Sequence, residues 1–303
     1  MSLWKIITKS SLFLNILIVL IILYIISLFY SNMNYEVIEN MENNTSLFNN
    51  SNIYDEFYSS IYDPLFYSKN KDDFELHKIL KHTKFDEKSY VLDIGCGTGN
   101  HVYEFSQKNI KAIGFDKSPH MINVCNKKFP ELDFKEGDAL NTLNFDEETF
   151  SHITSLYFTI YYIQNKRLFF QNCFQWLKPG GYLVLHLVNR SMFDPIIPPS
   201  NPLLLVSPQK YAKERITNSV VKFNNYDYNS NFEIKDSKGF FTEEFKQKNS
   251  KHPYRINKHQ LYMETQKEIL GAAKDFGFVV FAKTNMTPCQ YEYNYIYFLQ
   301  KPF

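Results

Sequence analysis

Short apolar segments alternate with longer amphipathic segments along the chain from residue 90 onward. The apolar segments have the length of buried strands, and glycine or proline turns open the segments between them as helices. This order predicts right-handed βαβ units, a parallel sheet and therefore a doubly wound, Rossmann-like α/β fold. The predicted strands cover residues 91–94, 112–115, 132–135, 153–157 and 182–188.

The pattern changes between residues 189 and 263. Prolines come first, and short alternating segments follow, separated by Asn, Asp, Ser and Gly. This alternation predicts antiparallel strands, which we interpret as a cap insertion over the cleft. A helix over 263–276 and two strands, 278–283 and 293–300, complete a mostly parallel sheet of seven strands.

The N-terminal region carries an uncharged apolar segment at residues 12–30. As a helix it would span roughly 28 Å, about one hydrocarbon core, so it predicts a transmembrane anchor after a short tail at residues 1–11. A cleaved signal peptide is the alternative, although its apolar region is usually shorter and no small-residue cleavage site precedes Ser31. Residues 31–51 are polar and predict a flexible linker, which leaves residues 52–303 as the folded domain.

Charges around the anchor bear on localisation. Lys5 and Lys9 precede the apolar segment, and the residues after it carry only acidic charges until Lys69. The positive-inside rule then favours a cytoplasmic N-terminus. Two lysines leave the orientation open, so the expectation is a single-pass membrane protein whose domain lies on an unassigned side.

Overall charge and cysteine content exclude some classes of protein. Lys plus Arg number 33 and Asp plus Glu 32, so there is no basic field of the kind that dominates nucleic-acid binding. The four cysteines are widely spaced, and Cys96 lies within a glycine-rich turn. Neither a disulfide framework nor a zinc site is predicted, and we expect neither nucleic acid nor a metal as a partner.

The glycine-rich turn is the clearest functional motif. It follows the strand at 91–94 with the spacing G-x-G-x-G, formed by Gly95, Gly97 and Gly99. Glycines there allow positive φ and a close approach of backbone to a ligand. Asp116 ends the next apolar strand, 21 positions after Gly95, where a carboxylate can accept both ribose hydroxyls of a nucleotide-type cofactor. The alternative for Asp116 is an N-cap of the helix that follows.

These residues resemble the class I S-adenosylmethionine-dependent methyltransferases, whose first motif is D-x-G-x-G-x-G and begins here at Asp93. The resemblance covers about residues 52 to 300 and is strongest to amino-sugar N,N-dimethyltransferases. Tyr54 and Tyr62 match their paired N-terminal tyrosines, and the turn from Cys96 to His101 matches their C-G-T-G-x-H. The resemblance implies S-adenosylmethionine as cofactor and an antiparallel pairing of the last two strands.

The resemblance also implies roles for individual residues. Asp93 would orient the ammonium end of the cofactor, although a carboxylate that caps the turn is an equally physical reading. Asp116 would hold the ribose, Asp138 would accept from the adenine amino group, and His101 would contact the cofactor carboxylate. The full set of expected cofactor-binding residues is Asp93, Gly95, Gly97, Gly99, His101, Asp116, Lys117, Asp138, Ala139 and Tyr157.

Methyl transfer from a sulfonium is an in-line displacement in which positioning can supply most of the acceleration. A base is needed only where the acceptor holds a proton, and the candidates are Tyr54, Tyr162 and His186. Amino-sugar enzymes carry a histidine at the position of Tyr162, so the acceptor stays open.

The motifs nevertheless favour a membrane-anchored methyltransferase that acts on N or O of a small or lipid-linked acceptor. The alternatives are a nicotinamide-dependent reductase, which the glycine spacing disfavours, and a non-catalytic module that binds the same cofactor.

Overall fold

The computed structural model describes residues 17–24, 45–195, 216–223, 226–248, 250 and 252–303. The chain forms two compact units, residues 1–45 and 46–303. In the first unit, residues 17–24 are helical, with apolar side chains such as Leu20 and Leu23 exposed. Among the described residues, no helix combines the length and apolar content needed to cross a bilayer. Most of the predicted anchor at 12–30, and most of the predicted linker at 31–51, lies outside them.

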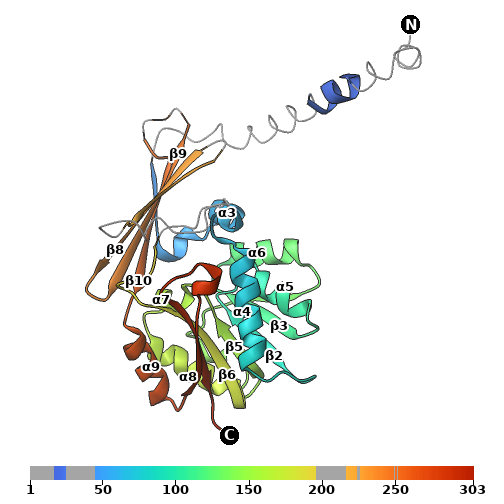
Figure 1. Cartoon of the computed structure of the whole chain (residues 1–303), viewed down its shortest axis with the longest axis vertical. Helices are drawn as coiled ribbons and strands as arrows, with labels where there is room; N and C mark the ends of the chain where they lie inside the picture. The colour runs from blue at the N-terminus through green and yellow to red at the C-terminus, as the bar shows by residue number, and fades with distance from the viewer. Residues whose placement is uncertain (1–16, 25–44, 196–215, 224–225, 249, 251) are drawn as a thin grey trace, which may run out of the picture. The chain divides into compact units, whose positions relative to one another are not determined.

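The second unit is built on a seven-stranded sheet in the order β11-β12-β6-β5-β2-β3-β4 (Figure 1). The strands from β2 to β6 are mutually parallel, while β12 pairs antiparallel with β6 and β11 with β12. This confirms the predicted doubly wound sheet and its antiparallel edge. The bounds are β2 (Tyr90–Ile94), β3 (Lys111–Asp116), β4 (Asp133–Glu136), β5 (Phe150–Ser155), β6 (Leu177–Val188), β11 (Val279–Asn285) and β12 (Asn294–Gln300).

Helices cover both faces of this sheet. Neighbouring residues of one strand point to opposite faces, so each strand contributes to two separate apolar clusters. In β2, Val91 packs into a cluster with Leu76 and Phe105, whereas Leu92 packs into a second cluster with Phe169 and Trp176. The first cluster draws on α4 (Lys69–His82) and α5 (Asn100–Ser106), and the second on α8 (Lys166–Trp176) and α9 (Gln266–Asp275). The remaining helices on the sheet are α6 (Pro119–Lys128), which follows β3, and the short α7 (Thr159–Tyr162), which follows β5.

The antiparallel strands predicted between the sixth strand and α9 are present, and they belong to a second sheet, the cap sheet. Its order is β1-β10-β9-β8-β7, and all pairs but one are antiparallel. Figure 1 shows it as a second layer beside α3. The strands are β1 (Ser46–Asn49), β7 (Asn218–Lys222), β8 (Tyr226–Lys235), β9 (Lys238–Gln247) and β10 (Arg255–Tyr262).

The start of the domain differs from the expectation. Residues 46–49, expected at the end of a flexible linker, form β1 and pair in parallel with β10. A 3-10 turn, η1 (Asn50–Ile53), leads into α3 (Glu56–Phe66), whose first turn is capped by the Asp55 carboxylate. Since α3 packs Tyr58 and Leu65 against Tyr228 and Phe245 of the cap, this N-terminal segment belongs to the cap layer. Two further 3-10 turns are η2 (Thr142–Asn144) and η4 (Thr287–Cys289).

Candidate cofactor and acceptor site

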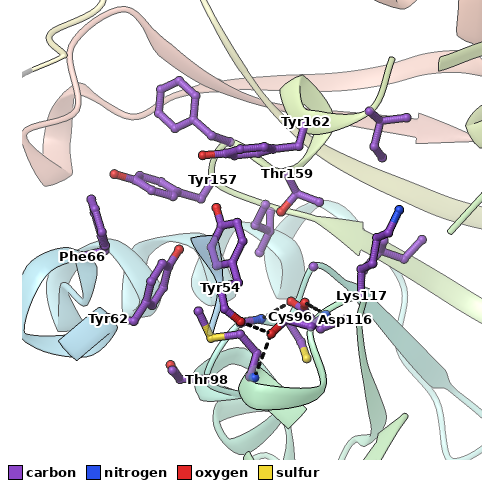
Figure 2. Close-up of a pocket in the computed structure, with 18 of the residues that line it drawn as sticks. Tyr54, Tyr62, Phe66, Cys96, Thr98, Asp116, Lys117, Tyr157, Thr159 and Tyr162 are labelled. Carbon is purple, nitrogen blue, oxygen red and sulfur yellow. Dashed lines mark hydrogen bonds between the residues drawn. The ribbon is translucent and has the colours of Figure 1, made fainter. Parts of the chain in front are cut away.

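A cavity of about 880 Å³ lies where β2, β3 and β5 end, between the glycine-rich turn and the cap layer. The order of strands reverses at β2, and such a switch point is where open α/β sheets bind ligands. The volume is in the range of pockets that hold a cofactor or a drug-sized ligand. Figure 2 shows Cys96 and Asp116 at the base of this pocket, with Tyr157 and Tyr162 above them.

The glycine-rich turn and Asp116 are tied together by hydrogen bonds. Gly95 and Gly97 adopt φ of +72° and +55°, which side chains rarely tolerate. The Gly97 N–H donates to Oδ2 of Asp116 at 2.9 Å, and the Ser118 N–H donates to Oδ1 at 2.9 Å. The N-cap of α6 is Ser118, whose hydroxyl accepts from the Met121 N–H. The structure therefore does not support the alternative of Asp116 as the cap of this helix.

The environment of Asp116 suits a ligand that offers hydroxyl groups. Burial raises the pKa of its carboxyl to about 6, against the opposing effect of the backbone hydrogen bonds from Ser118 and Gly97. A carboxylate offers about four acceptor positions. The backbone bonds leave part of that capacity free on a side chain that lines the cavity.

Next to the turn, buried charges form a compact cluster. The ammonium of Lys71 lies 2.6 Å from Asp72 and 3.0 Å from Glu75, and Nε2 of His101 lies 2.9 Å from Glu75. Burial would lower the pKa of His101, but the two carboxylates outweigh it and raise that pKa to about 9. Lys71, Asp72 and His101 line the cavity, so this corner presents two cations and balancing carboxylates.

The same cluster contains three metal-ligand residue types, because donor atoms of Asp72, Glu75 and His101 lie within 4.8 Å of one another. The ammonium of Lys71, however, is at bonding distance from both carboxylates. We therefore interpret the cluster as an ion-pair network. Asp93 lies beside it, buried, and accepts a hydrogen bond from the Thr154 hydroxyl at 2.6 Å. Within the described part of the chain, the Asp93 carboxylate makes no hydrogen bond to the backbone of the turn, and it lines the cavity.

The other end of the cavity is formed by residues after β3 and β4. Lys117 and Asp138 line it and form an ion pair at 2.7 Å, and the Leu140 N–H donates to the second oxygen of Asp138. Burial raises the pKa of Asp138, but the hydrogen bonds from Lys117 and Leu140 outweigh it and leave this pKa below its usual value. Ala139 also lines the cavity there.

Two predicted site residues do not line the cavity. Gly99 is the N-cap of α5 with φ of +82°, and a Cβ there would lie 2.8 Å from the Phe134 ring, so its role is close packing. His186 is buried in β6, where its Nε2 bonds to Oδ1 of Asn294 at 2.9 Å. Burial lowers the pKa of His186 to about 4, which makes it a neutral core histidine at physiological pH.

Tyrosines form the wall opposite the glycine-rich turn. Tyr54, Tyr62, Tyr157 and Tyr162 all line the cavity, and the rings of Tyr54 and Tyr162 lie 6.0 Å apart in an edge-to-face arrangement (Figure 2). Tyr157 has φ of +53°, a strained conformation for a side-chain-bearing residue and one that clusters at functional sites. The predicted Tyr54 and Tyr162 therefore meet in the structure.

Sequence reasoning missed two residues behind this wall. The Tyr162 hydroxyl lies 2.8 Å from Nδ1 of His259, and Nε2 of His259 lies 2.7 Å from the Glu243 carboxylate. Both partners come from the cap, on β10 and β9. The sequence of β10 contains a signal for these residues. Every second position of this strand is buried, and these positions are Arg255, Asn257, His259 and Leu261. Three polar residues on the inward face of an amphipathic strand indicate a buried polar network rather than plain core.

Comparison with known proteins agrees with this geometry. Residues 91–181 match the family described as a methyltransferase domain. A phosphoethanolamine N-methyltransferase of Plasmodium falciparum is 33% identical over 113 residues, 36% of this chain and 42% of that protein. A dTDP-4-amino-2,3,4,6-tetradeoxy-D-glucose N,N-dimethyltransferase of Saccharopolyspora spinosa is 30% identical over 142 residues, 45% of this chain and 56% of that protein. The chain thus spans about half the length of these relatives.

Solved structures extend the likeness of fold beyond the matched segment. An amino pentose methyltransferase from Micromonospora echinaspora, solved with S-adenosylmethionine bound, superposes with a TM-score of 0.57 at 18% identity, covering 83% of this chain and 99% of that one. The family match at residues 91–181 and the amino-sugar relative confirm the resemblance to methyltransferases that the sequence indicates, and the solved structure shares the fold.

Proposed function

We propose that the chain is an S-adenosylmethionine-dependent methyltransferase that acts on N or O of a small or lipid-linked acceptor. The observation that carries the proposal is the Asp116 carboxylate. It is joined to the glycine-rich turn through Gly97 and lines a cavity large enough for a nucleoside-sized cofactor with an acceptor beside it. The methyltransferase family match and the relatives with small amine acceptors support the same activity.

The residues present fit this cofactor. Asp116 would accept the ribose hydroxyls, the backbone at Gly95 and Gly97 would border the chain that carries the sulfur, and Ala139 and Asp138 would border the base. The cations Lys71 and His101 would face the amino-acid end. When bound, S-adenosylmethionine supplies an electrophilic methyl group on a sulfonium.

The acceptor would occupy the part of the cavity below the cap. Tyr162 lines it from α7, Tyr54 lines it from the N-terminal segment of the cap layer, and the cap strands contribute Phe241, Leu261 and Tyr262. Aromatic faces stabilise a nearby cation and exclude water, which suits a reaction whose reactants include a sulfonium. The chain's own contribution is therefore to bind, orient and desolvate, and positioning of this kind can supply most of the rate acceleration.

Binding experiments test the cofactor site. Isothermal titration of S-adenosylmethionine into the full chain should show one site, and Asp116→Ala should abolish it. Glu131→Ala removes an exposed carboxylate from the same region and serves as the matched control. Equal affinity of Asp116→Ala and the parent would refute the assigned site. Binding of NADH in place of S-adenosylmethionine would favour a reductase, and cofactor binding without labelled-methyl transfer to any acceptor would favour a non-catalytic module.

We further propose that the apolar segment 12–30 anchors the chain in a membrane, where it would hold the domain near a lipid-linked acceptor. The uncharged length of that segment supports the proposal. Fractionation with carbonate washing tests it: the full chain should stay with the membranes, whereas a chain that begins at residue 45 should not. Release of the full chain by carbonate would refute the anchor.

A further inference from the structure

The Glu243 carboxylate sits in the cap layer with no exposure to solvent. Its Oε1 accepts hydrogen bonds from the hydroxyls of Tyr58 at 3.0 Å and Tyr228 at 2.7 Å. Its Oε2 bonds to Nδ2 of Asn257 at 3.0 Å and Nε2 of His259 at 2.7 Å. Burial raises the pKa of a carboxyl group, but the electrostatic interaction with His259 and the hydrogen bonds outweigh it, so the pKa of Glu243 lies below its usual value. Glu243 is therefore a buried anion with both oxygens saturated by donors.

The partners of His259 define its protonation pattern. Because Glu243 is an anion that only accepts, Nε2 of His259 must carry a proton and donate to it. In the neutral ring, Nδ1 is then a lone pair, and it faces the Tyr162 hydroxyl at 2.8 Å. This histidine is positioned to accept a proton from Tyr162, with a carboxylate behind it to stabilise the imidazolium that would form.

Tyr162 connects this pair to the cavity. It belongs to α7, at the end of β5, and lines the cavity beside Tyr54 (Figure 2). His259 itself is buried and does not line the cavity. The groups packed around the His259 ring are Tyr54 and Tyr58 from the η1–α3 segment, Tyr162 from α7, and Phe241 and Glu243 from β9. Glu243 is thus the one charged side chain among these neighbours.

We propose that the cap supplies a proton-accepting pair, His259 and Glu243, that acts through Tyr162 on an acceptor whose nucleophile must give up a proton. This rests on the proposed methyltransferase activity. Tyr162 is the catalytic residue that touches the acceptor, and His259 and Glu243 are positioning residues behind it. The acceptor class is then a hydroxyl or an ammonium group rather than an amine that is already neutral.

The proton balance is complete within these groups. The hydroxyl or ammonium group loses one proton, and the electron pair that this frees on oxygen or nitrogen forms the bond to the methyl carbon. The carbon–sulfur bond breaks and leaves its electron pair on sulfur. That proton passes to the Tyr162 oxygen as the hydroxyl proton of Tyr162 passes to Nδ1 of His259. The resulting imidazolium is paired with Glu243 and returns its proton to solvent when the product leaves.

A direct test needs neither cofactor nor acceptor. Nitrogen NMR of ¹⁵N-histidine-labelled full chain should show His259 protonated at Nε2 and hydrogen-bonded at Nδ1, and Tyr162→Phe should shift the Nδ1 resonance alone. His77 is exposed, so His77→Gln serves as the control and should leave these signals in place. A proton on Nδ1 of His259, or an Nδ1 resonance unchanged in Tyr162→Phe, would overturn the proposal.

Kinetics then separate proton transfer from structure. With phosphoethanolamine, an amino sugar and catechol as probes, Tyr162→Phe and His259→Gln should lower kcat by roughly 10²- to 10⁴-fold near pH 7. The Kd for S-adenosylmethionine should change less than about threefold. Activity of both variants should recover as the pH rises past the pKa of the probe, because bulk water then removes its proton.

The possible failures are distinguishable. A deficit that is equal at every pH would mean that Tyr162 and His259 are only structural, and would overturn the relay. Turnover by neither parent nor variants, with S-adenosylmethionine bound, would overturn the acceptor class. Absence of S-adenosylmethionine binding by the parent would instead refute the proposed function, while the NMR result would still report on the hydrogen-bonded chain.

Discussion

The ion pair between His101 and Glu75 should make the free energy of unfolding fall as the pH becomes alkaline. The variant His101→Gln isolates the contribution of this ion pair. Nε2 of His101 lies 2.9 Å from Glu75 and 4.0 Å from Asp72, and Glu75 is fully buried. These carboxylates raise the pKa of His101 to about 9 against the effect of burial. Glutamine fills a similar volume and can still donate a hydrogen bond, but it cannot carry the charge.

The magnitude follows from proton linkage. His101 titrates near 6.5 in the unfolded chain and near 9 in the folded protein, so its stabilisation is complete below pH 6.5 and is lost as the pH rises through 9. Each pH unit between these values is worth about 1.4 kcal/mol, and the whole interval about 3 kcal/mol. Lys71 and His101 lower the pKa of Glu75 to about 2 despite its burial. This shift arises partly from the same contact with His101, so the stabilisation from Glu75 is not added to that from His101.

Urea unfolding of the full chain at several pH values measures this effect. From pH 6.5 to 9.5 the parent should lose roughly 3 kcal/mol more unfolding free energy than His101→Gln does. His77→Gln, at an exposed histidine, should follow the parent. Parallel curves for the parent and His101→Gln across this range would refute the assignment of a charged His101 in the folded state.

Two further predictions concern the turn and its carboxylate. Gly99→Ala should lower the free energy of unfolding in urea by roughly 1–3 kcal/mol, because φ is +82° and the new Cβ would lie 2.8 Å from the Phe134 ring. The control is Gly271→Ala in α9, where the Cβ would meet open space, and it should raise the free energy of unfolding by up to about 1 kcal/mol. Equal effects would contradict the packing role. The pKa of Asp116 is raised to about 6, so the affinity for S-adenosylmethionine, measured by calorimetry, should be constant above pH 7 and should weaken roughly tenfold for each pH unit below 6. An affinity that does not change with pH would argue against a role of the ionised Asp116 in binding.

The architecture was readable because each signal for it is local. The period and length of apolar segments such as 91–94 identify them as strands. The glycine-rich turn and Asp116 lie within about 20 residues of each other in the sequence, so their relation can be seen from the sequence alone. The structure places these parts together as expected. The positive φ values at Gly95 and Gly97 give the physical reason why glycine occupies those positions.

The parts that sequence reasoning did not find depend on contacts between distant segments. Glu243 meets His259 because β9 pairs with β10 in a register that sets Glu243 opposite Asn257, and one residue of slip would turn both side chains away. His186 was a candidate base because it lies late in the fifth predicted strand, a place where core histidines are also common, and the structure shows it buried in the core. Neither outcome is encoded in spacing along the chain.

The pairing of β1 with β10 has a practical consequence for any shortened version of the protein. Ser46–Asn49 covers the outer edge of β10, and the Gln260 N–H further along donates to the Asn50 side chain. A chain cut at residue 52 would strip that edge and leave a row of unpaired amide and carbonyl groups, the kind of surface through which sheets recruit strands from other molecules. Material cut there would be prone to associate through its cap, whereas a start at residue 45 keeps the edge closed.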